Sequence, residues 1–94
     1  FLDSFNLFEN WVELIFAHSN GLHIKGQKLE DLRLYSFDKE ILPIDVSVKD
    51  NKLIILLENG VNVTRIDLGY CNAPEHNLYN DDDYLASPFS LKLN

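Results

Sequence analysis

Cations, cysteines and long apolar runs are all scarce in this chain, and each shortage excludes a class of protein. The 94 residues hold only eight lysines and arginines against 15 aspartates and glutamates, which gives a net charge of −7. Direct binding to a phosphate backbone relies on clustered cations, so we expect no direct nucleic-acid partner. No apolar run approaches the ~20 residues of a membrane-spanning helix, and we expect no membrane contact.

The single cysteine, Cys71, rules out a disulfide bond within the chain. It favours a reducing compartment, and no basic-then-apolar secretion signal is present, so we expect an intracellular location, cytoplasmic or nuclear. The chain begins at Phe1 without methionine, and we expect a processed chain, a fragment or an excised part. With 46% hydrophobic and 24% charged residues, the composition predicts one small globular domain with a modest core.

The stretch 43–69 carries the clearest pattern. Ile44–Lys49 alternates apolar and polar residues, which predicts a half-buried strand. Asp50-Asn51 predicts a turn, because both side chains tolerate left-handed backbone. The uninterrupted apolar run Leu53–Leu57 predicts a strand covered on both faces. We therefore expect a hairpin in which Val46 faces Ile55.

A second hairpin is predicted at Asn59-Gly60, the strongest short signal for such a turn. The following apolar residues change phase between Val63 and Ile66, which favours a bulge near Thr64-Arg65. We expect the result to be a three-stranded antiparallel meander in which Ile55 faces Thr64. Because a lone meander cannot cover both faces of its middle strand, other parts of the protein or a partner must cover one of them.

The remainder divides into a lead-in (1–10), a first blade-like unit (11–42) and an acidic loop with a terminal strand (70–94), around the central meander (43–69). The lead-in fits either helical spacing or the last strand of a preceding unit. In the first unit we expect a strand at Trp11–Ala17, a hairpin at Asn20-Gly21, a strand around Leu32–Leu34, and a link over 38–43. The terminal strand begins near Phe89.

An internal repeat relates the first unit to the central meander. Val12–Ile24 and Lys52–Val63 share an apolar strand, a polar residue, Asn-Gly, and then apolar-polar-apolar. The two Asn-Gly pairs lie roughly 40 residues apart, a period typical of propeller blades. We therefore predict an all-β protein of antiparallel meanders that form about two β-propeller-like blades. The alternative is an ordinary antiparallel domain with two similar hairpins, a small self-contained β-sandwich.

The second hairpin resembles those of WD-repeat β-propellers. Ile66-Asp67-Leu68 occupies the place of that family's closing tripeptide, and Pro43–Val46 is similar to the opening of its inner strand, although Gly-His and a Trp before Asp67 are absent. The order of strands also resembles the late blades of the non-catalytic WD-repeat subunit of a fungal guanine-methylating tRNA methyltransferase. This resemblance implies a scaffold that supports a catalytic partner, with the remaining blades of the same protein as neighbours.

Three groups of residues could carry chemistry. His18 and His23 face each other across the predicted Asn20-Gly21 turn and could ligate a metal, but no third ligand is evident, and two surface imidazoles are the favoured interpretation. Cys71 and His76 could form a nucleophile pair, but lack an orienting carboxylate. Asn80–Asp83 offers oxygen ligands without calcium-loop spacing, which favours a solvated acidic loop. We expect no cofactor and no metal.

Aromatic and acidic residues are interleaved in the tail and could anchor a protein partner through rigid aromatic contacts. The candidate partner-binding residues are Tyr79, Asp81, Asp82, Asp83, Tyr84 and Phe89. The rings could equally cover the open face of the meander. Taken together, the sequence predicts a non-enzymatic protein-interaction scaffold. The alternatives are an acidic β module that binds a basic protein, of inhibitor or immunity type, and a small metal-dependent enzyme that uses the histidine pair.

Overall fold

Short β-strands make up all the regular structure of the described residues. The computed structural model describes residues 2–17, 21–24, 29, 32–69, 78–79 and 89–93. Its strands are, in chain order, β1 (Leu2–Leu7), β2 (Trp11–Phe16), β3 (His23–Ile24), β4 (Leu32–Ser36), β5 (Lys39–Ile41), β6 (Asp45–Lys49), β7 (Lys52–Leu56), β8 (Arg65–Leu68), β9 (Leu78–Tyr79) and β10 (Phe89–Lys92). Every pairing between them is antiparallel, so the all-β antiparallel prediction is confirmed.

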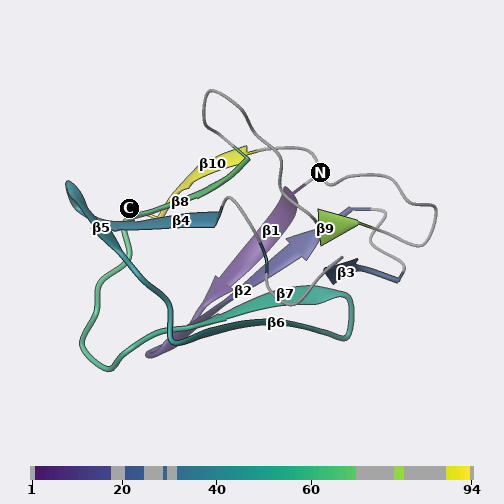
Figure 1. The fold of residues 1–94 in the computed structure, drawn as a ribbon, viewed down its shortest axis with the longest axis horizontal. Coiled ribbons are helices and arrows are strands. Elements are labelled where there is room, and N and C mark those ends of the chain that lie inside the picture. The colour runs from purple at the N-terminus through teal and green to yellow at the C-terminus, as the bar shows by residue number, and fades with distance from the viewer. Residues whose placement is uncertain are drawn as a thin grey trace.

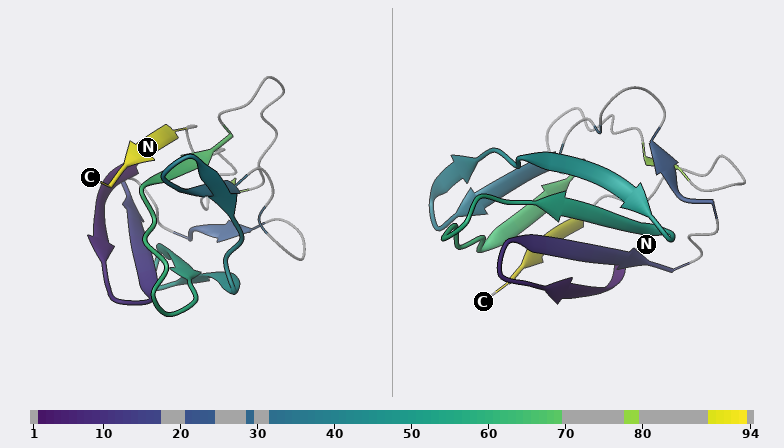
Figure 2. Two further views of the ribbon diagram at one scale, coloured as in Figure 1. Left: turned by 90° about the vertical axis from the view of Figure 1, so that its left-hand side faces the viewer. Right: turned by 90° about the horizontal axis from the view of Figure 1, so that it is seen from below.

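The strands form two four-stranded sheets and one small pair (Figure 1). The first sheet has the order β1-β2-β7-β6, the second sheet has the order β10-β8-β4-β5, and β3 pairs with β9. The views in Figure 2 show the two larger sheets facing each other, and buried side chains from both form one core. This architecture is compatible with blade-like sheets and with the sandwich that the sequence leaves as an alternative.

Alternation along β2 and β7 builds the inner face of the first sheet. Val12 and Leu14 of β2 lie opposite Ile55 and Leu53 of β7, and all four side chains are fully buried. The intervening residues of both strands are only half-buried. Because successive side chains of a strand point to opposite faces, one face of β7 packs on the core and the other faces outward. The apolar run 53–57 is thus covered on one face by the rest of this chain.

The second sheet follows the same rule. Leu34, Ile66 and Leu68 point inward and are buried. Tyr35 and Arg65 pair on the opposite face and are half-buried. At the sheet edge, Phe89 of β10 packs its ring on Phe16 of β2, with ring centroids 5.9 Å apart. This contact joins the two sheets at one end of the core.

The β6–β7 hairpin is the one that the sequence predicts. Asp50 and Asn51 have φ values of 53° and 63°, as both central residues of a type I′ turn require. The resulting register places Val46 opposite Ile55, which confirms the expected pair. Asn51 also accepts a hydrogen bond at Oδ1 from the backbone N–H of Gly21, 3.1 Å away. The turn therefore ties the end of the first sheet to the segment that leads into β3.

The sequence prediction did not include the β4–β5 hairpin, which occupies part of the expected link over 38–43. Its two-residue loop is Phe37-Asp38, flanked by the Ser36–Lys39 pair. Phe37 has a φ of 57°, and positive φ at the first loop residue alone is the type II′ arrangement, which favours glycine. The N–H of Phe37 donates to Thr64 Oγ1 at 2.7 Å, and the ring is 69% exposed.

The predicted three-stranded meander is wrong at its third strand. Ile55 has Val46 on one side and Val12 on the other, so it does not face Thr64. The chain turns at Asn59-Gly60, where Gly60 has a φ of 83°, and then crosses to the second sheet, where β8 pairs with β4 and β10. The phase change near Thr64-Arg65 therefore marks a crossover between sheets, and a bulge is not needed to explain it.

The predicted first hairpin is also wrong. The strand at Trp11–Phe16 forms as expected, but its neighbours are β1 and β7. The segment after Gly21 instead pairs with β9, with His23 opposite Tyr79. Within the lead-in, Leu2–Leu7 is a strand paired to β2, so the helical option is excluded. Predictions for the strand at 32–34 and for the terminal strand at Phe89 are confirmed.

Candidate functional site

Only two of the six predicted partner-binding residues lie within the described residues. Tyr79 lies in β9, opposite His23, with the two rings 6.4 Å apart and inclined by 26°. Phe89 lies in β10, where its ring packs on Phe16. Asp81, Asp82, Asp83 and Tyr84 lie outside the described residues. At Phe89 the ring helps to cover the core, and partner binding by this set stays a prediction.

The predicted histidine pair is only half described, so it stays a prediction. His18 lies outside the described residues, and His23 has Tyr79 as its cross-strand partner. Nδ1 of His23 lies 2.7 Å from the carbonyl oxygen of Gly21. A carbonyl can only accept, so this nitrogen carries the proton.

Other predicted chemical groups lie beyond the described ranges. Cys71, His76 and Asn80–Asp83 belong to segments that the structure does not describe. Among the residues that it does describe, no three His, Cys, Asp or Glu side chains gather as metal ligands. The same residues contain no helix of the length and hydropathy needed to cross a membrane.

The outer face of the first sheet carries a group of apolar side chains. We define the aromatic patch as Phe8, Trp11, Ile15, Ile54 and Leu56. Trp11 lies directly opposite Leu56, and the other β2 and β7 members share their face because of the period-two alternation. Four members are half-buried, and Phe8 is 40% exposed. No strand of the described residues packs over this face, and all five side chains of the patch are partly exposed.

Two rings at one end of this patch are stacked. The Phe8 and Trp11 centroids lie 4.4 Å apart, with the planes inclined by 18°. The backbone N–H of Phe8 donates to the carbonyl of Trp11 at 2.9 Å, which fixes the turn between β1 and β2. The stack is therefore held by its own backbone and presents a rigid aromatic surface.

Acidic side chains gather around the Trp11 end of the patch. Asp45 follows Trp11 and Leu56 in the same cross-strand row, so it lies about 10 Å from Trp11 across two strand spacings. Glu58 lies beside this end, because the next residue back, Leu57, donates its N–H to the Asn10 carbonyl at 2.8 Å. Glu9 is exposed in the β1–β2 turn. The lysines of this face lie at the other end, near the Asp50-Asn51 turn.

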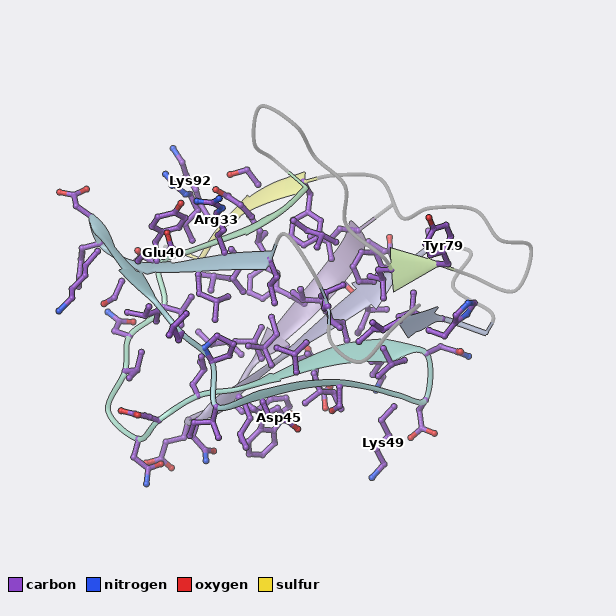
Figure 3. The ribbon with its side chains drawn as sticks, in the orientation of Figure 1. Arg33, Glu40, Asp45, Lys49, Tyr79 and Lys92 are labelled. Carbon is purple, nitrogen blue, oxygen red and sulfur yellow. The ribbon has the colours of Figure 1, made fainter. Side chains whose placement is uncertain are left out.

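Glu13 separates the two ends of the aromatic patch. Its Oε1 atom lies 3.8 Å from Lys52 Nζ and accepts a hydrogen bond from Asn6 Nδ2 at 3.5 Å. Glu13 is thus partly neutralised, whereas Asp45 has no ion pair among the described residues. Figure 3 shows Asp45 and Lys49 on the outer side of β6, at opposite ends of that strand. The face is therefore acidic around its aromatic stack and basic at its far end.

The outer face of the second sheet is polar and charged. One cross-strand row contains Arg33, Asp67 and Ser90, and the next contains Glu40, Tyr35, Arg65 and Lys92. Figure 3 shows Arg33, Glu40 and Lys92 grouped on this sheet, away from Asp45 and Lys49. The two outer faces of the molecule thus differ in chemistry.

A groove of about 370 Å³ opens between β6 and the start of β4. It is lined by Leu29, Leu32, Leu42, Pro43, Ile44, Asp45 and Val46. Leu42 and Ile44 are exposed, at 84% and 57%. Because β5 ends at Ile41, the chain leaves the second sheet here and leaves these side chains uncovered.

Comparison of the chain with models of known protein families gives no match, and searches of curated proteins and of solved structures give none either. The assignment of a function therefore rests on the surfaces themselves. The aromatic patch had one signal in the sequence. Leu53–Leu57 is apolar on both faces of its strand, so the side chains of one face had to point outward or contact a partner. The pairing of Trp11 with Leu56 had no local signal.

Proposed function

We propose that this chain is a non-enzymatic protein-interaction module that binds a basic partner protein through the aromatic patch. The observation that carries the proposal is the rigid Phe8–Trp11 stack beside partly exposed Leu56 and beside Asp45, which has no ion pair within the described residues. Aromatic anchors surrounded by polar groups are typical of the residues that contribute most to protein interfaces. This is the aromatic and acidic chemistry expected for the tail, but on a different surface.

A basic partner fits this surface for two physical reasons. Trp presents a negative π face that attracts Arg and Lys side chains, and aliphatic stems of those side chains can pack on Leu56. Asp45, Glu9 and Glu58 add negative charge around the stack, and the net charge of −7 favours association with a cationic protein at a distance. The interaction should therefore weaken as the salt concentration rises.

The scaffold setting that the WD-repeat resemblance implies would use the same face. A neighbouring blade or a partner subunit packed on the patch would bury the outer face of β7. The apolar run 53–57 would then be covered on both faces, as its sequence predicts. The single cysteine supports an intracellular location for such a complex. Cooperative urea unfolding of the isolated chain, coincident by circular dichroism and fluorescence, would contradict the need for neighbouring blades.

Trp11 is the only tryptophan of the chain, and it reports directly on this surface. We expect its fluorescence to change on titration with an arginine- and lysine-rich peptide at low salt. Asp45→Asn should weaken binding about two- to fivefold, since a surface charge pair contributes about 0.5–1 kcal/mol. The matched control is Glu40→Gln, which removes one carboxylate from the opposite sheet and should leave the affinity unchanged.

Two results would count against the proposal. The first is an unchanged Trp11 emission in a solution where the peptide demonstrably binds, because the peptide would then occupy another surface. The second is an equal loss of affinity in Asp45→Asn and Glu40→Gln, because only the net charge would then matter.

A further inference from the structure

The outer face of the second sheet brings three of the eight basic residues together in an acidic protein. Arg33 lies on β4, Arg65 on β8 and Lys92 on β10, which are adjacent strands. Arg33 lies opposite Asp67, and its Nη1 atom lies 3.7 Å from Glu40 Oε1. Arg33 and Arg65 each lie near a carboxylate of this face, since Arg65 Nε lies 3.4 Å from Asp67 Oδ2, and Lys92 is the least compensated of the three cations.

Arg65 is held in one orientation by its neighbours. Its guanidinium carbon lies 4.1 Å from the centroid of the Tyr35 ring, a cation–π contact. Its Nε atom is buried and lies 3.4 Å from Asp67 Oδ2, an ion pair that lacks hydrogen-bond geometry. The side chain as a whole is 41% exposed. One part of the guanidinium is thus fixed on the sheet while the rest of the side chain reaches solvent.

Asp67 is itself fixed from the other side. It is 7% exposed, and its Oδ1 atom accepts a hydrogen bond of 2.6 Å from the hydroxyl of Ser90. A buried carboxylate with two such neighbours has little freedom to follow Arg65 if the guanidinium moves. The Ser90–Asp67–Arg65 chain therefore pre-positions the guanidinium before any ligand arrives.

Lys92 lies directly opposite Arg65 on the same face. Like charges at directly opposed positions of a sheet destabilise it. Lys92 has no anionic partner within the part of the chain that the structure describes. An anion placed between the two side chains would convert this repulsion into two attractions.

We propose that the face formed by Arg65, Lys92 and Tyr35 binds carboxylate side chains of an acidic protein segment. A planar carboxylate matches the geometry of a fixed guanidinium, and a neighbouring ammonium adds a second charge-assisted hydrogen bond. A nucleic acid is a poorer match, because Asp67 and Glu40 lie on the same face and the chain carries −7 overall. This site is separate from the aromatic patch and does not depend on the function proposed for it.

The proposal is tested by titrating the full chain with a ten-residue glutamate-rich peptide and following backbone amides by two-dimensional NMR. The amides of β4, β8 and β10 should shift, and the Trp11 indole signal should not. Lys92→Gln should weaken binding about five- to tenfold, the loss expected when one solvent-exposed hydrogen-bonded contact is removed. Lys92 is exposed near the end of an edge strand, so this variant should fold, and the loss of repulsion should raise its urea midpoint in the absence of peptide.

The matched control is Lys49→Gln, which removes one cation from the edge of the first sheet. Equal weakening in Lys49→Gln and Lys92→Gln would overturn the proposal, because binding would then follow net charge alone. It would also be overturned by shifts confined to the first sheet, or by inorganic phosphate or free glutamate competing as well as the peptide does. Failure here would leave the Trp11 titration with a basic peptide unaffected, so the two proposals are tested separately.

Discussion

Phe37 provides a direct test of the backbone geometry, because its place in the β4–β5 turn favours glycine. We expect Phe37→Gly to be more stable than Phe37→Ala. Both variants lose the same ring, which is 69% exposed, and both keep the N–H that donates to Thr64 Oγ1. The two variants then differ only in the presence of a Cβ atom on a residue whose φ is 57°.

The expected difference follows from two opposing terms. A residue with a Cβ in the left-handed region costs about 1–2 kcal/mol. Glycine loses more backbone entropy on folding, which offsets about 0.4–1 kcal/mol of that advantage. Phe37→Gly should therefore be the more stable variant by about 0.5–1 kcal/mol, the reverse of the usual order of glycine and alanine within a strand.

Gly60→Ala is the matched control for the net cost of a Cβ atom at a position with positive φ. Gly60 has a φ of 83°, and a Cβ built on it would meet nothing within 4 Å. The loss of stability on Gly60→Ala then comes from the backbone alone. It should equal the difference in stability between Phe37→Gly and Phe37→Ala. Urea unfolding would measure both, and with a slope of about 1–3 kcal/mol per molar each midpoint shift is roughly 0.5 M. The reasoning is refuted if Gly60→Ala lowers the urea midpoint as expected while the urea midpoint of Phe37→Ala equals or exceeds that of Phe37→Gly.

Two further predictions concern the joins between elements. Thr64→Val removes a hydroxyl that accepts a hydrogen bond from the Phe37 N–H and donates one to the Tyr35 carbonyl at 3.3 Å, so stability should fall by about 1 kcal/mol. Hydrogen exchange of the Phe37 amide should become faster in this variant, and an unchanged exchange rate would contradict this role of the hydroxyl. Leu53→Ala removes a fully buried side chain between the sheets and should cost about 2–5 kcal/mol by urea unfolding, whereas Ile54→Ala on the outer face should cost clearly less.

The strands with regular alternation were predictable because their periodicity is local. The strand at 52–56 and its register with Val46 followed from a run of apolar residues and a turn with two residues that tolerate positive φ. Its second neighbour was not predictable. A period of two identifies which side chains share a face, but it says nothing about which strand lies alongside. The pairing of Trp11 with Leu56 was therefore not predicted from the sequence, and neither was the aromatic patch.

The β5 strand was missed for a different reason. Its turn contains Phe37 where a type II′ hairpin favours glycine, so the usual turn signal is absent and the segment reads as a link. At Asn59-Gly60 the opposite occurred: the signal for a turn was correct, but the chain beyond it crosses to the other sheet. Turn residues specify local backbone angles, whereas the packing of the core decides which sheet receives the next strand.

The interleaved strand order also governs how this chain can fold. The β1–β2 and β6–β7 hairpins are local and can form in about 1–10 µs. Neither four-stranded sheet is complete until β2 finds β7 and β4 finds β8, and such distant pairings slow folding to the range of milliseconds to seconds. During synthesis on the ribosome, the free edge of β2 must wait until Leu56 has emerged before its partner strand β7 exists. The exposed lifetime of that hairpin, more than the final stability, would then decide how often a new chain aggregates or needs a chaperone.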